Sequence, residues 1–84
     1  MSDGFASERA TGLDAARKRL GLSARDVWVG YFAVGGNCSL ADVTGWLSGR
    51  GGISWRDHNL MAQSLNDAFC ERGLNHPVGY LEAP

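Results

Sequence analysis

Residues 20–35 read LGLSARDVWVGYFAVG, and this stretch contains the start and stop signals of one helix. Ser23 stands three residues before Asp26, the spacing of a capping box, in which the Ser hydroxyl accepts from the backbone N–H of the third helical residue. The Asp charge also suits the positive end of the helix dipole. Gly35 lies where a residue in the left-handed conformation would end the helix. The stretch therefore predicts a helix over residues 24–34.

The same start signal occurs three more times along the chain. Ser or Thr stands three residues before Asp in the pairs Thr11/Asp14, Ser39/Asp42 and Ser54/Asp57. Gly residues that match these starts as stop signals are Gly21, Gly49 and Gly73. Together the signals predict helices over about 12–20, 24–34, 40–48 and 55–72. We expect an all-α fold, a compact bundle of four helices with an extended C-terminal tail after Gly73, where Pro77 ends any helix.

The length of the chain allows one domain. With 84 residues, it is shorter than the ~100–150 residues of a common domain. We expect a flexible N-terminus over 1–10, a single helical domain over 11–81 and a tail over 82–84. Helix 24–34 is apolar nearly all round, which is typical of a central helix buried on several sides. The expected core is built around Trp28, Phe32, Trp46 and Phe69, and the small residues Gly30 and Ala33 favour close helix contact within the bundle.

Composition excludes several classes of protein. Eight Lys and Arg against nine Asp and Glu leave a net charge of −1, whereas nucleic-acid-binding domains are commonly basic. There is no apolar run of ~18 residues that would span a membrane. The first residues have neither the basic nor the apolar region of a secretory signal. Two Cys are too few for a disulfide scaffold, so we expect a cytoplasmic location.

The sequence offers no set of residues for catalysis or for a metal. The four candidate ligands are Cys38, His58, Cys70 and His76, and none of them forms a close pair of the kind found in structural zinc sites. A Cys38–Cys70 disulfide is an alternative use of the thiols. A nucleophilic pair of Cys70 with a His would lack shelter in so small a fold. We therefore expect no enzymatic activity, no cofactor and no metal.

The residues left over from the core favour contact with another protein. Trp55 lies about 120° from the centre of the apolar stripe of its helix, and Arg56 follows it; Trp and Arg are the commonest residues at interaction hot spots. Tyr80 and Leu81 add apolar groups near the tail. The alternative for Trp55 is packing as a lid over one end of the bundle. We expect a non-enzymatic regulatory or signalling module that binds another protein, as a monomer or weak homodimer.

DNA binding by a helix-turn-helix is the second hypothesis. Polar residues of the types that read base edges share one face of the last helix: Arg56, Asn59, Gln63 and Asn66. Basic residues that could contact phosphates are Arg17, Lys18, Arg19, Arg25 and Arg50. Against this hypothesis, the loop before the last helix is longer than the usual turn, and the helix itself is slightly acidic.

Four runs of residues carry a family resemblance: LGLS at 20–23, WVGYFAVGG at 28–36, WLSG at 46–49 and LNDAF at 65–69. They resemble a family of small uncharacterised actinobacterial helical proteins with the pattern W-x-x-YFA-x-GG, an L-x-G helix end and a late L-N-[DE] helix. That family has no settled activity. The resemblance implies a small bacterial helical protein with a regulatory role, and it assigns no site residues.

Overall fold

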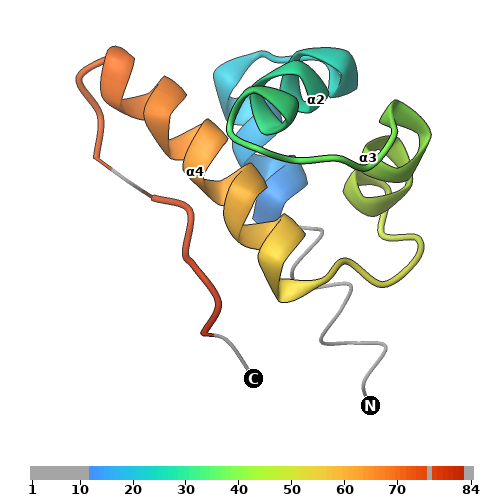
Figure 1. Cartoon of the computed structure of the whole chain (residues 1–84). Helices are drawn as coiled ribbons and strands as arrows, with labels where there is room; N and C mark the ends of the chain where they lie inside the picture. The colour runs from blue at the N-terminus through green and yellow to red at the C-terminus, as the bar shows by residue number, and fades with distance from the viewer. Residues whose placement is uncertain (1–11, 76, 83–84) are drawn as a thin grey trace.

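The four expected helices are present in the computed structural model, which describes residues 12–75 and 77–82. The first helix covers residues 12–20. It is followed by α2 (Ala24–Ala33), α3 (Leu40–Leu47) and α4 (Trp55–Glu71), as Figure 1 shows. The described residues form no strand, so the all-α prediction is confirmed, and every helix ends within one residue of its expected boundary. The expected flexible segment 1–10 and the Thr11 cap lie outside the described residues.

The caps explain why the helices begin and end where they do. Ser23 and Ser39 each form a complete capping box, because the hydroxyl accepts from the backbone N–H three residues on and the Asp accepts from the cap N–H. Ser54 accepts from the N–H of Asp57, but that carboxylate does not return to the cap N–H. Glycines with left-handed backbone follow all four helices: Gly21, Gly35, Gly49 and Gly73, with φ of 70°, 108°, 80° and 75°.

One apolar core lies between the helices. The α2 helix packs against both α3 and α4, which places it in the middle of the bundle. Its Tyr31 is completely buried and meets Trp46 of α3 edge to face, with ring centroids 6.1 Å apart. The rest of the buried apolar set comes from every helix: Leu13, Ala16, Leu20, Val27, Val43, Leu47, Ile53, Met61, Ala62, Leu65, Phe69 and Val78.

The expected core is wrong at one important position. Trp46 and Phe69 are buried and Trp28 is partly buried, but Phe32 is 61% exposed. The physical reason is that α2 turns Val27 and Tyr31 into the core, and Phe32 follows Tyr31 by 100° around the helix. The α2 helix is therefore buried on one side and open on the other.

The expected close contact of α2 within the bundle is confirmed at Gly30. A Cβ placed on Gly30 would overlap the hydroxyl of Ser64 on α4, so the absence of a side chain lets the two helices approach. Ala33, which was expected to share this contact, is exposed.

An extended segment follows α4 and runs back along it (Figure 1). The chain turns after Gly73, and residues 77–82 have no regular secondary structure. We call residues 77–82 the strap. Val78 of the strap is buried against the helices, which confirms the extended C-terminal tail packed on the bundle. No helix in the described part of the chain is long and apolar enough to cross a membrane.

Candidate protein-interaction surface

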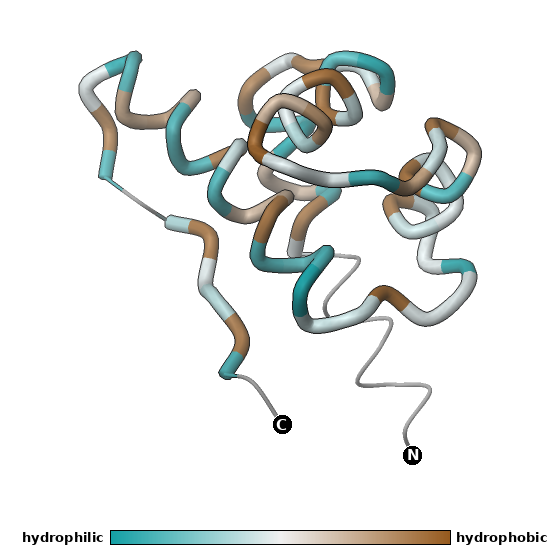
Figure 2. Tube along the Cα trace, viewed as in Figure 1, coloured by the Kyte–Doolittle hydropathy of each residue, from teal (hydrophilic) through white to brown (hydrophobic). Residues whose placement is uncertain are grey.

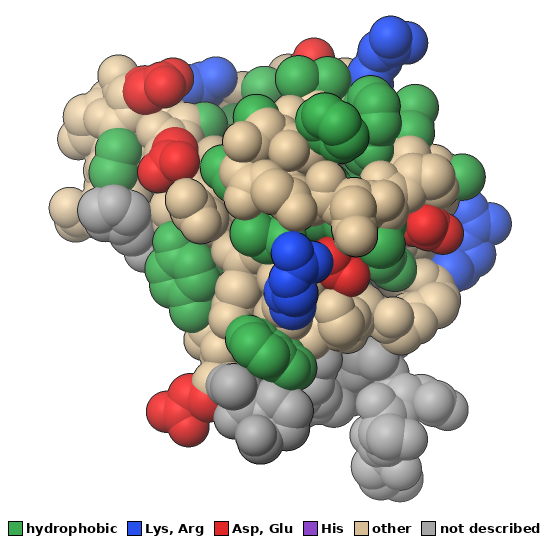
Figure 3. All heavy atoms as spheres, viewed as in Figure 1, with side chains coloured by type: hydrophobic (Ala, Val, Ile, Leu, Met, Phe, Trp, Pro, Cys, Tyr) green, Lys and Arg blue, Asp and Glu red, His purple; other side chains and the backbone are tan. Residues whose placement is uncertain are grey.

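The outward side of α2 carries a stripe of apolar side chains. We call Arg25, Trp28, Val29 and Phe32 the α2 surface; their spacing of three, four and seven residues places them on one side of the helix. Val29 is 53% exposed and Phe32 is 61% exposed. Figure 3 shows hydrophobic side chains gathered over this helix, whereas Figure 2 shows that polar and apolar residues alternate along most of α4.

The aromatic part of the α2 surface is held in place. The indole Nε1–H of Trp28 donates to the carbonyl oxygen of Cys38 at 3.1 Å. The ring of Phe32 lies 5.8 Å from that of Trp28, centroid to centroid, and is tilted by 42°. Because Trp28 is fixed by its hydrogen bond, it supports the exposed ring of Phe32 from one side.

Basic side chains stand at both ends of the α2 surface. Arg25 is exposed in the first turn of α2. At the other end, Nη2 of Arg56 donates to the carbonyl oxygen of Gly35, just beyond the end of α2, at 3.5 Å. The Arg56 side chain is 56% exposed, and its Nη1 lies 3.9 Å from the carboxylate of Asp57. The stripe is therefore apolar in the middle and has an exposed guanidinium group at each end.

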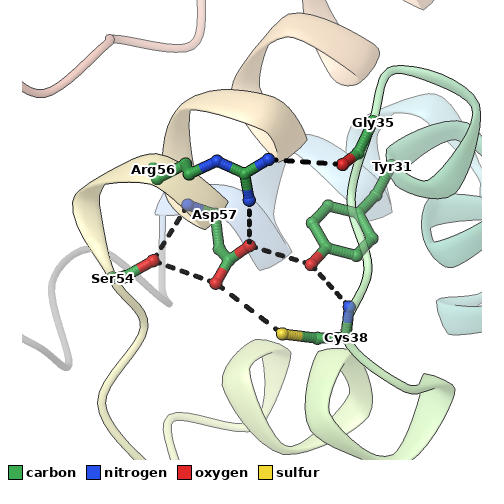
Figure 4. A network of polar contacts seen from close by, with 6 residues as sticks. All are labelled: Tyr31, Gly35, Cys38, Ser54, Arg56 and Asp57. Carbon is green, nitrogen blue, oxygen red and sulfur yellow. Dashed lines mark hydrogen bonds and ion pairs between the residues drawn. The ribbon is translucent and has the colours of Figure 1, made fainter.

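A polar network beneath Arg56 joins α2 to the start of α4 (Figure 4). The hydroxyl of Tyr31 donates to Asp57 at 2.9 Å and accepts from the backbone N–H of Cys38 at 3.1 Å. The other Asp57 oxygen accepts from the Ser54 hydroxyl at 2.9 Å and from the Cys38 thiol at 3.7 Å. Burial raises the pKa of Tyr31, and the Cys38 side chain and the Asp57 carboxylate raise it further. The network holds the helices together, since both Asp57 oxygens accept bonds from neighbouring groups.

The other expected protein contacts are exposed to different degrees. Trp55 is 39% exposed at the start of α4, and Tyr80 is 55% exposed on the strap. Leu81 is only partly exposed, and its backbone is bonded to Asn59. Among these expected contact residues, Arg56 bonds the backbone just after the end of α2, at Gly35.

The expected base-reading face of α4 is largely taken up by the strap. Asn59 bonds the backbone of Leu81 in both directions at 2.7 Å, and Asn66 is completely buried with the same kind of contact to Val78. Placing Asn66 on an exposed face was therefore wrong. Gln63 is exposed.

The expected phosphate-contacting residues do not share one environment. Arg17 and Lys18 lie 2.7 and 3.4 Å from the carboxylate of Asp14. Burial raises the pKa of Asp14, but the hydrogen bonds and charges of these two cations outweigh it, and the net pKa is lowered. Arg19 lies over the ring of Phe69, with its guanidinium carbon 5.4 Å from the centroid. Arg50 is exposed in the loop before α4.

A groove of about 460 Å³ lies between the first helix, α4 and the strap. Its walls are mostly apolar or backbone, from residues such as Ala16, Phe69 and Val78, and among the described residues Arg19 is the one Arg or Lys that lines it. The two cysteines are not joined: Cys38 is partly buried and Cys70 is exposed on α4. Across residues 12–75 and 77–82, no three His, Cys, Asp or Glu side chains gather as a metal site.

The exposed residues Val29 and Phe32 were missed because apolar residues on a helix normally predict burial. One signal was available in the sequence. Arg25 lies on the same side of the helix as Phe32, seven residues earlier, and a charge within an apolar stripe favours an exposed stripe.

Comparison with known proteins gave no matching protein-family model, no significantly similar curated protein and no significantly similar solved structure. The resemblance to small actinobacterial helical proteins therefore stays a prediction, and the case for function rests on the chain's own surfaces.

Proposed function

We propose that this chain is a small interaction module that binds another protein through the α2 surface. The observation that carries the proposal is the exposure of Val29 and Phe32 on a helix whose opposite side is completely buried at Tyr31. Exposed aromatic and aliphatic groups that adjoin each other, and that are fixed from behind, are typical of interaction sites. Such a helix can meet a partner without rearranging its own fold.

The charges at the ends of the stripe favour a partner with acidic residues. Arg25 and Arg56 would face carboxylates on either side of an apolar centre. A second copy of this chain is a poorer partner for the same surface. An antiparallel pairing of two α2 helices would bring Arg25 near Arg56 of the other copy, and a parallel pairing would bring Arg25 near its equivalent. Like charges that meet in an interface oppose binding.

This proposal includes a regulatory or signalling role in the bacterial cytoplasm, which the sequence resemblance and the two free cysteines favour. DNA binding is the alternative, and the occupied amides of Asn59 and Asn66 count against it. A mobility shift with DNA fragments at low salt that fades as salt rises would support DNA binding over the present proposal.

The test selects peptides from a phage-displayed random library on the full-length chain. The selected peptides are then measured against Phe32→Ala and against Tyr80→Ala, a matched loss of another exposed aromatic ring. We expect Phe32→Ala to weaken binding at least tenfold, Tyr80→Ala to leave it unchanged, and the selected sequences to combine apolar residues with Asp or Glu. Circular dichroism should show both variants folded, because neither ring lies in the core.

Two results would contradict the proposal. One is a selection in which no peptide binds Phe32→Ala less tightly than it binds the wild type. The other is a set of selected sequences without acidic residues, together with affinities that do not change between low and high salt.

A further inference from the structure

Side chains of α4 hold the strap by hydrogen bonds to its backbone. Asn66 donates to the carbonyl of Val78 and accepts from its N–H, both at 2.9 Å. Asn59 makes the same pair of bonds with Leu81, both at 2.7 Å. Nε2 of His58 donates to the carbonyl of Gly79, which lies between Val78 and Leu81 in the strap, at 3.0 Å. The α4 helix thus makes five hydrogen bonds to three residues of the strap.

The spacing of the two Asn residues matches an extended chain. They are seven residues apart on α4, which is about 10.5 Å of helix. The strap residues that they bind are three apart, which is about 10 Å of extended backbone. Both Asn residues therefore meet the backbone of an extended segment that runs antiparallel to the helix.

We propose that this face of α4 is a receptor for an extended peptide segment of another protein, and that the strap occupies it as the resident ligand. In the described contacts Asn59 and Asn66 bond only main-chain atoms, so they select a ligand by its extended conformation. The apolar contacts then determine which side chains the ligand can have. The ligand is a segment with apolar residues three apart, as Val78 and Leu81 are, and with a free N–H at both positions. This site is separate from the α2 surface and does not rest on the function proposed for it.

The burial of Asn66 supports a site built for a backbone ligand. The residue is completely buried, and its amide is satisfied by the strap alone in the described contacts. A buried amide without a partner costs free energy, so a segment that covers Asn66 has to offer it a backbone N–H and a carbonyl. A partner segment that displaces the strap would supply that backbone again.

The groove beside the strap gives a partner more room than the strap uses. Gly79 lines this groove, and a Cβ at position 79 would meet no atom within 4 Å. A partner can therefore have a side chain at this position, and an apolar one that entered the groove would bury more surface than the strap does.

The experiment adds a fluorescent synthetic peptide of residues 74–84 to full-length chains and measures its anisotropy. The chains are the wild type, a strap-released Val78→Asp/Leu81→Asp chain, and the released chain with Asn59→Ala. We expect the released chain to bind at least tenfold more tightly than the wild type, whose strap competes, and Asn59→Ala to reverse that gain. If circular dichroism shows that the double variant is not helical, Leu81→Ser takes its place.

A peptide N-methylated at the positions of Val78 and Leu81 is the matched control, because it keeps the side chains and loses both donated N–H groups. Equal binding of the methylated and unmethylated peptides, or equal binding by wild-type and released chains, would overturn the proposal. So would a folded released chain that binds no peptide. A wild-type dimer that Asn59→Ala abolishes would also overturn it, since the occupant would then be the strap of a second copy. Phe32→Ala should leave the peptide affinity unchanged, which separates this result from the test of the α2 surface.

Discussion

At the scale of single residues, Tyr31 connects three parts of the fold. Its ring packs in the core against Trp46, and its hydroxyl bonds Asp57 of α4 and the N–H of Cys38. Gly36 lies against the same ring, because a Cβ there would overlap three ring carbons of Tyr31. One side chain therefore determines how closely the loop after α2 and the start of α4 approach each other.

We expect Tyr31→Phe to lower the free energy of unfolding by about 1–3 kcal/mol, because it leaves the Cys38 N–H and an Asp57 oxygen without the hydroxyl that they bond. Urea denaturation followed by circular dichroism measures the change. Tyr80→Phe is the matched control, since the Tyr80 ring is exposed. If Tyr31→Phe lowers the free energy of unfolding no more than Tyr80→Phe does, the role proposed for the Tyr31 hydroxyl is contradicted.

Alkaline pH should destabilise the protein through the same hydroxyl. Because the pKa of Tyr31 is raised in the folded chain, the unfolded chain loses this proton first, at about pH 10. The contribution of the Tyr31 hydroxyl to the free energy of unfolding is constant below that pH. Above that pH it falls by up to about 1.4 kcal/mol per pH unit. Urea midpoints measured from pH 8 to 11 should fall less steeply for Tyr31→Phe than for the wild type, and parallel curves would contradict the expectation.

We expect Gly36→Ala to lower the free energy of unfolding by about 1–3 kcal/mol, because the added methyl group overlaps the Tyr31 ring. Gly52→Ala is the control, since a Cβ at Gly52 meets nothing within 4 Å. That substitution should be neutral or slightly stabilising, because Ala restricts the unfolded chain. Thermal unfolding compares the two variants, and equal effects would contradict the close approach at Gly36.

At the scale of elements, the helices could be predicted from the sequence because their signals are local. Each cap pairs residues three apart, and each stop is a single Gly, so a few neighbouring residues determine each boundary. Asn59 and Asn66 gave no such signal, since their partners lie 22 and 12 residues away in the strap. From the sequence alone, an Asn on a helix is predicted to face solvent, because the distant segment that covers it is not known.

The same locality limited the prediction of α2. Its apolar residues predict burial, but burial depends on which sides of the helix other elements cover, and in the described structure α3 and α4 both pack on α2. Phe32 is left on the open side for that reason. The candidate site was thus predicted in part, at Arg56, whereas the exposed stripe beside it required the packing of the whole bundle.

The cap of α3 provides a prediction for one element. We expect Ser39→Ala to lower the free energy of unfolding by about 1 kcal/mol, because the hydroxyl no longer accepts from the Asp42 N–H. Ser39→Gly should lower the free energy of unfolding by only a few tenths of a kcal/mol, since Gly is a tolerated cap residue. Urea denaturation of both variants tests this order, with the exposed Ser48→Ala as control, and a larger loss for Gly than for Ala would contradict it.

At the scale of the whole molecule, contacts between residues far apart in the chain hold the ends to the middle. Nη2 of Arg72, just after α4, donates to the carbonyl of Leu20 at the end of the first helix at 2.8 Å. The strap then returns along α4 and buries Val78 in the core. The first helix and the strap therefore lie on α4 from two directions, and the groove between them is a consequence of this arrangement.

The strap should open more easily than the helices that it covers, because side-chain hydrogen bonds and few apolar contacts hold it. We expect native-state hydrogen exchange to show protection of the Leu81 amide, which bonds Asn59, at a lower opening free energy than the amides of Met61 and Leu65 in α4. Asn59→Ala should remove the protection of Leu81 and leave that of Met61 nearly unchanged, since the bonds it breaks belong to the strap alone. Equal losses at Leu81 and Met61 would mean that strap and bundle open as one cooperative unit, and a partner segment would then have to unfold the protein in order to reach Asn66.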